Sequence, residues 1–152
     1  MTAQISADGV FSSSRFFPFT PEQVLAAFAD TNRLATWWGP DGFTNTFEIC
    51  EFKPQGRWHF VMHGPDGKNY RNENVFLETS LPRIVIRHNS QPNFTLTVTL
   101  TEDAGNTNLV WHQACDDPRF AANVAHIIVP ANEQNLDRLQ TVLSATTQAT
   151  TR

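Results

Sequence analysis

The chain has 152 residues, of which 40% are apolar and 17% are charged, a composition typical of one folded domain and not of a disordered chain. Its 11 Lys and Arg residues are scattered and its formal net charge is −4, so it lacks the basic stripe that nucleic-acid binding requires and we expect no nucleic-acid partner. No apolar run approaches the roughly 18 residues of a membrane span, and residues 1–9 do not resemble a signal peptide. We therefore expect no membrane partner and a cytoplasmic location.

The residue types also limit metal and redox chemistry. Cys50 and Cys115 are the two cysteines, too few for a disulfide framework and without metal-ligand spacing, so we expect two free thiols. His59 and His63 share one predicted strand, on which four positions span roughly 13 Å, too far for both to bind one ion. We expect neither a metal site nor a cofactor.

The N-terminal third predicts one strand and two short helices. A strand at 10–19 is followed by a helix start at Thr20, where Gln23 stands at the position of a capping-box partner. A second short helix is expected at about 31–37, before the turn-rich segment 38–42.

Six further strands follow, each bounded by residues typical of turns. They are expected at 43–52, 57–63, 69–78, 83–89, 94–101 and 107–114. In the segment 94–101, apolar side chains alternate strictly with threonines, which predicts one buried face and one exposed face. Consecutive hairpins of this kind form an antiparallel sheet.

The C-terminal segment predicts a long amphipathic helix. Asp117, which precedes a proline, is a second helix start. We expect helix at 119–129, a kink or a restart at Pro130, and helix again at 131–144 with an apolar stripe. Residues 145–152 are expected to fray.

Together these elements predict an α+β domain, and their order resembles that of the helix-grip fold. Its expected parts are a curved antiparallel seven-stranded sheet, two short helices, and a long C-terminal helix that encloses a cavity. We expect a single domain over residues 1–152, with an ordered core at about 10–144 and flexible termini.

Three segments carry a resemblance to a known family. They are Leu-Ala-Thr-Trp-Trp-Gly-Pro at 34–40, Met-His-Gly-Pro-Asp-Gly at 62–67, and Pro-Ala-Asn-Glu-Gln-Asn-Leu-Asp-Arg-Leu at 130–139. These residues resemble the Hsp90 ATPase activator-homologue (Aha1 C-terminal-domain-like) branch of the START/Bet v 1-like (SRPBCC) superfamily, in its bacterial single-domain form. The resemblance implies the helix-grip fold. Many members of the branch have Gly-Trp where this chain has Ala131-Asn132, which places a polar amide at the expected cavity mouth.

The expected ligand-binding residues are mostly aromatic, apolar or amide side chains of the strands, the Trp-Trp segment and the final helix. They are Trp37, Trp38, Trp58, Phe60, Met62, Tyr70, Asn72, His88, Phe94, Leu96, Trp111, Asn132 and Leu136. For the Trp37–Trp38 pair, a cavity wall and a structural plug remain alternatives. For Trp58, Phe60 and Met62, the alternatives are cavity lining and core packing.

Three functions remain open from the sequence. The first is binding of a small hydrophobic or aromatic ligand, by a monomer or a homodimer. The second is an enzyme of the polyketide-cyclase type found among superfamily relatives, for which Tyr70, His88, His112 and Glu133 are the acid–base candidates. The third is a stress-related, co-chaperone-like domain that binds a protein surface, as the name of the branch suggests. We favour ligand binding, because the sequence contains no nucleophile signature.

Overall fold

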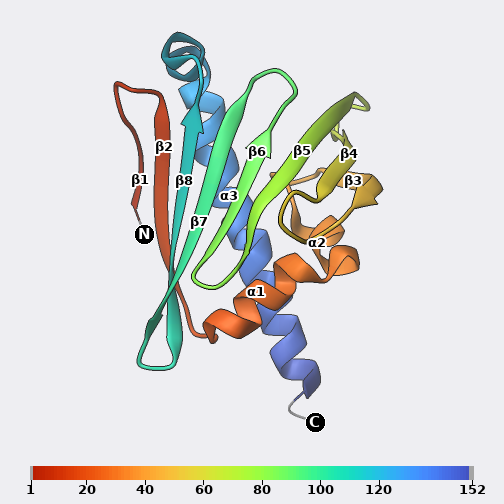
Figure 1. Cartoon of the computed structure of the whole chain (residues 1–152), viewed down its shortest axis with the longest axis vertical. Coiled ribbons are helices and arrows are strands. Elements are labelled where there is room, and N and C mark those ends of the chain that lie inside the picture. The colour runs from red at the N-terminus through yellow and green to blue at the C-terminus, as the bar shows by residue number, and fades with distance from the viewer. Residues whose placement is uncertain (1, 151–152) are drawn as a thin grey trace.

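The computed structural model describes residues 2–150 of the chain (Figure 1). We expect flexible termini, and three of the terminal residues, 1 and 151–152, lie outside the described residues. In chain order the elements are β1 (Thr2–Ile5), β2 (Val10–Phe17), α1 (Pro21–Ala29), α2 (Thr31–Trp37), β3 (Thr44–Cys50), β4 (Arg57–His63), β5 (Asn69–Ser80), β6 (Arg83–His88), β7 (Phe94–Asp103), β8 (Asn106–Cys115) and α3 (Pro118–Thr150).

All strands form one antiparallel sheet in the order β1-β2-β8-β7-β6-β5-β4-β3. The strands from β3 to β8 follow one another as hairpins, and β2 pairs with β8. The seven predicted strands and the α+β helix-grip fold are confirmed. The sheet also has an additional edge strand, because β1 pairs with β2. A strand of four residues is too short to give a clear alternation in the sequence.

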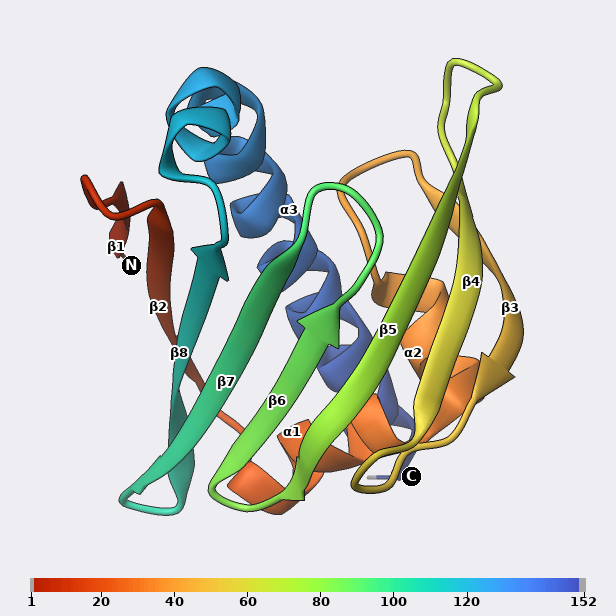
Figure 2. The same cartoon turned by 45° about the horizontal axis from the view of Figure 1, so that its top comes forward.

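The helix α3 crosses one face of the sheet, and α1 and α2 lie at one end of it (Figures 1 and 2). At this end the interior is filled by buried side chains of α1, of β2, β7 and β8, and of the second half of α3. They include Phe17, Val24, Phe28, Leu100, Leu109, Leu139 and Leu143. This part of the molecule is a packed core, in which large-to-small substitutions strongly reduce the free energy of unfolding.

Local signals in the sequence explain the two short helices. The Thr20 hydroxyl accepts a hydrogen bond from Gln23 N (3.1 Å), and Gln23 Oε1 accepts one from Thr20 N (2.8 Å). This complete capping box defines the start of α1, as predicted. At the end of α2, the buried Trp37 donates its indole N–H to Ala27 O (3.0 Å), which ties α2 to α1.

The long helix begins where the sequence predicts it, because Asp117 accepts hydrogen bonds from two backbone N–H groups of the first turn. It then runs unbroken from Pro118 to Thr150, so of the two alternatives predicted at Pro130, a kink or a restart, the restart is wrong. A proline removes one helical hydrogen bond, and the buried side chains of Ala121 and Leu136 hold the helix on either side of it. None of the helices in the described part of the chain combines the length and apolar character that a membrane span needs.

The two cysteines are free thiols, as predicted. Cys50 lies on the edge strand β3 and Cys115 on β8, with four other strands between them. A disulfide requires α-carbons within about 7 Å, so this strand order separates the two thiols.

Candidate functional site

A cavity of about 560 Å³ lies between the sheet and the first half of α3. Its other walls are the segment that follows α2 and the facing ends of the β4–β5 and β6–β7 hairpins; Figure 2 shows these hairpin tips at the same end of the molecule as the start of α3. Most of the expected ligand-binding residues line it. They are Trp38, Met62, Tyr70, Asn72, His88, Phe94, Leu96, Trp111 and Asn132.

Four expected residues, Trp37, Trp58, Phe60 and Leu136, belong to the packed core and do not line the cavity. Trp37 packs edge-on against Phe28, with ring centroids 4.9 Å apart. Trp58 is stacked against Phe60 (4.6 Å between centroids), and Leu136 on α3 is also fully buried. Each points inward as predicted, but the space in front of it is filled by other side chains.

The structure adds lining residues that the sequence did not reveal. The first half of α3 contributes Phe120, Val124, Ile127 and Ile128, and the segment after α2 contributes Gly39, Pro40 and Phe43. Two buried amides, Gln113 and Asn135, also line the cavity. Gln113 had a detectable signal, because it shares the inward face of β8 with Trp111 and is polar.

The cavity opens to solvent at an apolar rim. Tyr70 is 44% exposed, Phe120 38% and Ile127 56%, and all three also line the cavity. They come from β5 and from the first half of α3, which therefore border the opening.

The segment 38–43 forms a cavity wall that α3 holds in place. The Arg138 guanidinium donates hydrogen bonds only to backbone carbonyls of this region. The acceptors are the carbonyl oxygens of Thr36, Trp38, Gly39, Pro40 and Phe43, at 2.8 to 3.3 Å. Burial lowers the pKa of Arg138, but an arginine remains charged at neutral pH. The backbone N–H groups of Asp41 and Gly39 also donate hydrogen bonds to the side-chain oxygens of Gln134 and Asn135, respectively (3.1 Å each).

Gly39 has a specific reason to be glycine. Its φ of 99° lies in the left-handed region, which residues with a Cβ rarely adopt. A Cβ at this position would also lie 2.7 Å from Met62 Cε. The close approach of the backbone to Met62 sets the shape of the cavity at this wall.

His88 lines the cavity, but a hydrogen-bond chain engages both of its ring nitrogens. Nδ1 lies 2.7 Å from Asn74 Oδ1, while the Asn74 amide nitrogen donates to Trp58 O; Nδ1 is therefore the protonated nitrogen. Nε2 then accepts from the Ser90 hydroxyl (3.1 Å), whose oxygen accepts from Glu73 N. Burial, and next the charge of Arg87, lower the pKa of His88 to about 4.

Because of this arrangement, His88 contributes an uncharged side chain to the cavity wall. Its ring is stacked on Phe94 with centroids 4.4 Å apart. At neutral pH the imidazole carries a proton on Nδ1 alone, is therefore uncharged, and offers a flat face beside the Phe94 ring.

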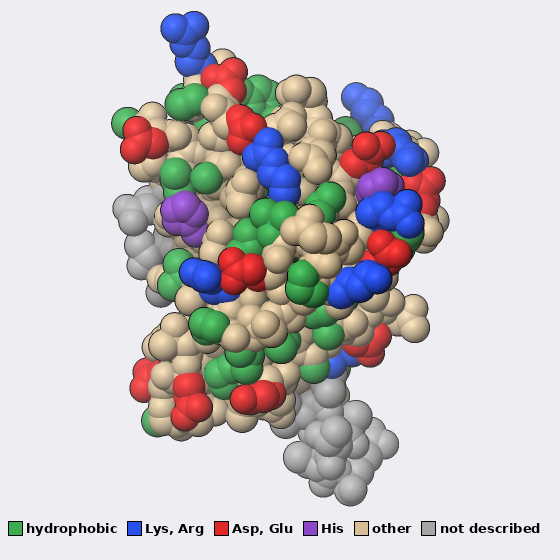
Figure 3. Space-filling view, viewed as in Figure 1, with side chains coloured by type: hydrophobic (Ala, Val, Ile, Leu, Met, Phe, Trp, Pro, Cys, Tyr) green, Lys and Arg blue, Asp and Glu red, His purple; other side chains and the backbone are tan. Residues whose placement is uncertain are grey.

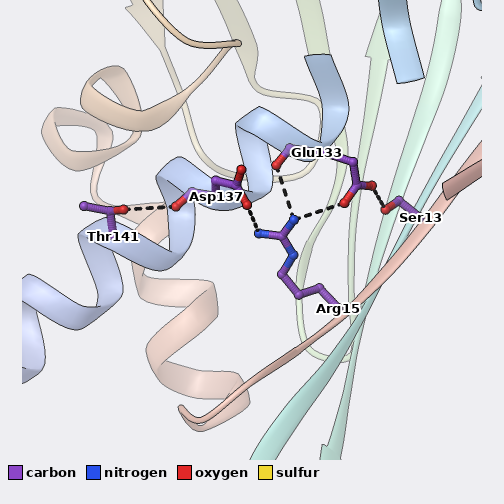
Figure 4. A network of polar contacts seen from close by, with 5 residues as sticks. All are labelled: Ser13, Arg15, Glu133, Asp137 and Thr141. Carbon is purple, nitrogen blue, oxygen red and sulfur yellow. Dashed lines mark hydrogen bonds and ion pairs between the residues drawn. The ribbon is translucent and has the colours of Figure 1, made fainter. Parts of the chain in front are cut away.

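Glu133, another acid–base candidate, belongs to a polar network between β2 and α3 (Figure 4). Arg15 forms ion pairs with Glu133 (3.0 Å) and with Asp137 (2.6 Å), and the Ser13 hydroxyl donates to Glu133. Ser13 and Arg15 are buried, and none of these residues lines the cavity. The network joins α3 to the sheet outside the cavity.

The remaining acid–base candidates are dispersed. His112 is exposed on β8 between Trp111 and Gln113, so it lies on the opposite face of the sheet from the cavity. The Tyr70 hydroxyl is at the rim, 3.5 Å from Asp66 Oδ2. The candidates Tyr70, His88, His112 and Glu133 therefore do not converge on one point.

Among the described residues, the cavity wall contains no Asp, Glu or Lys side chain. Its titratable side chains are Tyr70, Arg71, His88 and Cys115. Burial raises the pKa of the Cys115 thiol, and Arg71 is directed to the surface, where it pairs with Glu48 (2.7 Å) and Glu73 (3.5 Å). Cationic and anionic side chains also lie next to one another elsewhere on the surface. Figure 3 shows one face of the molecule, on which blue Lys and Arg side chains lie beside red Asp and Glu side chains. Within the described part of the chain, no cluster of three His, Cys, Asp or Glu side chains is arranged to hold a metal ion.

Comparison with solved structures shows the same fold in bacterial proteins. A protein from Arthrobacter aurescens superposes with a TM-score of 0.85 at 20% identity, over 95% of this chain and 91% of that one. A protein from Nitrosomonas europaea gives 0.84 at 16% identity, over 95% and 99%. The AHSA1 protein from Silicibacter pomeroyi gives 0.71 at 18% identity, over 90% and 99%. At these identities the likeness concerns the fold alone.

The sequence itself places the chain in a family. No curated protein matches it. The family model described as "Activator of Hsp90 ATPase homolog 1-like protein" matches residues 18–144, which include the three segments that carry the resemblance noted above. The chain therefore belongs to the family of Activator of Hsp90 ATPase homolog 1-like proteins.

Proposed function

We propose that this protein binds a small, largely apolar molecule in the cavity beneath the first half of α3. One observation carries the proposal: a space of about 560 Å³ whose walls are mostly aromatic and aliphatic side chains. Small-molecule sites have volumes of roughly 300–1,000 Å³ and combine apolar walls with a few polar groups. The Trp38 and Trp111 rings, 5.7 Å apart, supply large apolar surfaces for such a ligand.

Binding fits the arrangement of titratable groups better than catalysis does. Acid–base catalysis needs donors and acceptors within hydrogen-bond reach of the same substrate. The ring nitrogens of His88 are hydrogen-bonded to Asn74 and Ser90. The carboxylate of Glu133 accepts hydrogen bonds from Ser13 and Arg15. A binding protein needs only complementary walls and a small number of polar anchors.

The co-chaperone hypothesis requires an apolar patch away from the cavity. Three of the large exposed hydrophobic side chains, Tyr70, Phe120 and Ile127, belong to the cavity rim. On the other face of the sheet, Phe16 and Val110 are exposed on the neighbouring strands β2 and β8. Two side chains make a small patch, so this hypothesis has weaker support than ligand binding.

Methyl NMR spectroscopy can locate a bound ligand inside the molecule. We expect naphthalene or indole, titrated into methyl-labelled protein, to shift the signals of Leu96, Ile127 and Ile128 in a saturable way. The methyl groups of Leu109 and Leu143 serve as internal controls, because they lie in the packed core. If no member of a broader panel of aromatic and fatty compounds shifts the three cavity methyl signals, the proposed function is wrong.

Native mass spectrometry of freshly purified protein gives an independent test. A ligand with a slow dissociation rate should remain bound and add a discrete mass to the folded protein. The added mass should disappear after denaturation, and it would identify the natural ligand.

A further inference from the structure

Of the five side-chain amides that line the cavity, three lie where β8 faces α3, and the other two, Asn72 and Gln91, lie near the hairpin tips. Gln113 comes from β8, and Asn132 and Asn135 come from successive turns of α3. Gln113 is 8% exposed and Asn135 5% exposed. Buried amides normally find hydrogen-bond partners, so the bonds they make and the bonds they leave open can be counted.

Only part of their hydrogen-bonding capacity is used within the protein. The Asn132 amide nitrogen donates to Gln113 Oε1 (3.0 Å), and Asn135 Oδ1 accepts from Gly39 N (3.1 Å). Among the described residues, Gln113 Nε2, Asn132 Oδ1 and Asn135 Nδ2 make no hydrogen bond. None of these three atoms is among the unpartnered polar atoms that are sealed from solvent. They are therefore accessible, and the cavity is the space that their side chains line.

The open positions form a definite pattern of donors and acceptors. Gln113 and Asn132, joined by one hydrogen bond, leave one side-chain NH2 group and one side-chain carbonyl oxygen without a partner. Exchanging oxygen and nitrogen in both amides preserves this result, because the pair would again leave one NH2 group and one carbonyl oxygen. Asn135 contributes a second donor, since its oxygen is held by the N–H of Gly39.

We infer that the Gln113–Asn132 pair recognises an uncharged carbonyl and N–H group of the ligand, as in a lactam or carboxamide attached to an aromatic or aliphatic body. Such a group presents one acceptor and one donor, which match the donor and acceptor that the pair leaves open. This inference rests on the proposed function, since it names the class of molecule that the same cavity binds.

The electrostatics of the cavity select for a neutral ligand. A charged ligand would lose its hydration on entry, and among the described residues no buried ion lines the cavity to compensate it. Arg71 is the one permanently charged side chain in the wall, and its partners Glu48 and Glu73 lie at the surface. His88 cannot supply a positive charge at neutral pH, because burial holds its pKa at about 4.

The inference is tested with four bicyclic probes of similar size and shape, by calorimetric titration at pH 7. The probe 2-quinolinone has the carbonyl and N–H pair, coumarin has the carbonyl without the N–H, naphthalene has neither, and 2-naphthoate is charged. We expect 2-quinolinone to bind at least about tenfold more tightly than naphthalene, because each hydrogen bond to a buried polar group contributes a severalfold gain. Coumarin should be intermediate and 2-naphthoate the weakest.

Two variants decide whether the amide pair causes this preference. Gln113→Leu should reduce the ratio of 2-quinolinone to naphthalene affinity to about twofold or less. Gln140→Leu makes the same chemical change on α3 outside the cavity and should keep the wild-type ratio. Folding of both variants is checked by circular dichroism and by naphthalene binding itself.

The possible results separate this inference from the proposed function. If wild-type protein binds naphthalene and 2-quinolinone equally, or if Gln113→Leu keeps the preference, the cavity binds ligands but the inferred amide recognition is wrong. If 2-naphthoate binds most tightly, the inference of a neutral ligand is wrong. If none of the probes and no member of the broader panel binds, the proposed function fails and the inference fails with it.

Discussion

The two halves of α3 meet the same sheet in different ways. In the second half, Leu136, Leu139 and Leu143 are buried in the packed core. In the first half, Ala121 is the one fully buried side chain among the described residues, and Ile127 is 56% exposed. One half is packed against the sheet, and the other half borders the cavity.

This difference shows how a small domain can keep a ligand-sized space without losing its fold. Polar contacts add to this packing. Arg138 donates hydrogen bonds to the segment after α2, and Glu133 and Asp137 form ion pairs with Arg15 of β2. These contacts fix the helix, so the first half need not fill the space beneath it. We expect stability to depend mainly on the second half and ligand affinity mainly on the first.

The largest loss of stability should come from Leu136→Ala. This side chain is fully buried in the core cluster, and such truncations remove apolar burial and leave a cavity. We expect the free energy of unfolding to fall by about 3–5 kcal/mol, measured by urea denaturation. A loss below about 1 kcal/mol would show that the second half is not the packed half.

Arg138→Ala should follow, with a loss of about 2–4 kcal/mol, because the partly buried backbone carbonyls of the 38–43 segment lose their charged donor. Ligand binding should weaken as well, since this segment forms a cavity wall. Arg57→Ala is the control: Arg57 has an exposed ion pair with Glu51, so its removal should change the unfolding midpoint little. Equal effects of the two substitutions would contradict the role given to Arg138.

His88 makes the cavity end of the sheet sensitive to acid. Its pKa is about 4 in the folded protein and about 6.5 in an unfolded chain. Between these values the unfolded state binds more protons, so stability rises with pH and is lost as the pH falls from 6.5 to 4. The shift corresponds to about 2–3 kcal/mol at the acidic end of this window.

The measurement compares the pH dependence of unfolding in wild type, His88→Gln and His112→Gln. Other groups titrate in this range, so the difference between curves is the informative quantity. We expect His88→Gln to flatten the curve between pH 4 and 6.5, and His112→Gln, an exposed control, to retain the wild-type slope. Identical slopes in all three proteins would mean that His88 is not held neutral.

The smallest effect should come from Ile127→Ala, the counterpart of Leu136→Ala in the first half of α3. An exposed side chain contributes little to folding, so we expect a change within about 0.5 kcal/mol. Affinity for an apolar ligand should nevertheless fall, because Ile127 lines the cavity. Loss of stability comparable to that of Leu136→Ala would remove the distinction between the two halves.

The fold could be predicted because its signals are local. The capping pair of Thr20 and Gln23 marks a helix start, and the apolar–threonine alternation of β7 shows which face of the strand is buried. Whether the helix continues through Pro130 or restarts there could not be decided in the same way, because contacts far apart in the sequence hold it.

The candidate site could be predicted only in part, for a related reason. Trp58, Phe60 and Met62 share one face of β4, and only Met62 reaches the cavity. Alternation shows that a side chain points inward, but the opposing elements determine whether it meets core or empty space. Likewise, the pairing of Gln113 with Asn132 depends on how α3 lies over β8, which no local pattern encodes.

The central claim, that the cavity is a binding space, is tested most directly by thermal unfolding of wild type and Leu96→Trp with a panel of aromatic and fatty compounds. Leu96 lines the cavity. A ligand at a hundred times its Kd stabilises the folded state by about 2.7 kcal/mol, which should raise the Tm of wild type by about 5–10 °C. The larger Trp side chain should occupy the space, leaving the variant folded but abolishing this shift. If no compound shifts wild type and Leu96→Trp loses about 1–3 kcal/mol, as overpacking of a solid core would cause, the binding space does not exist.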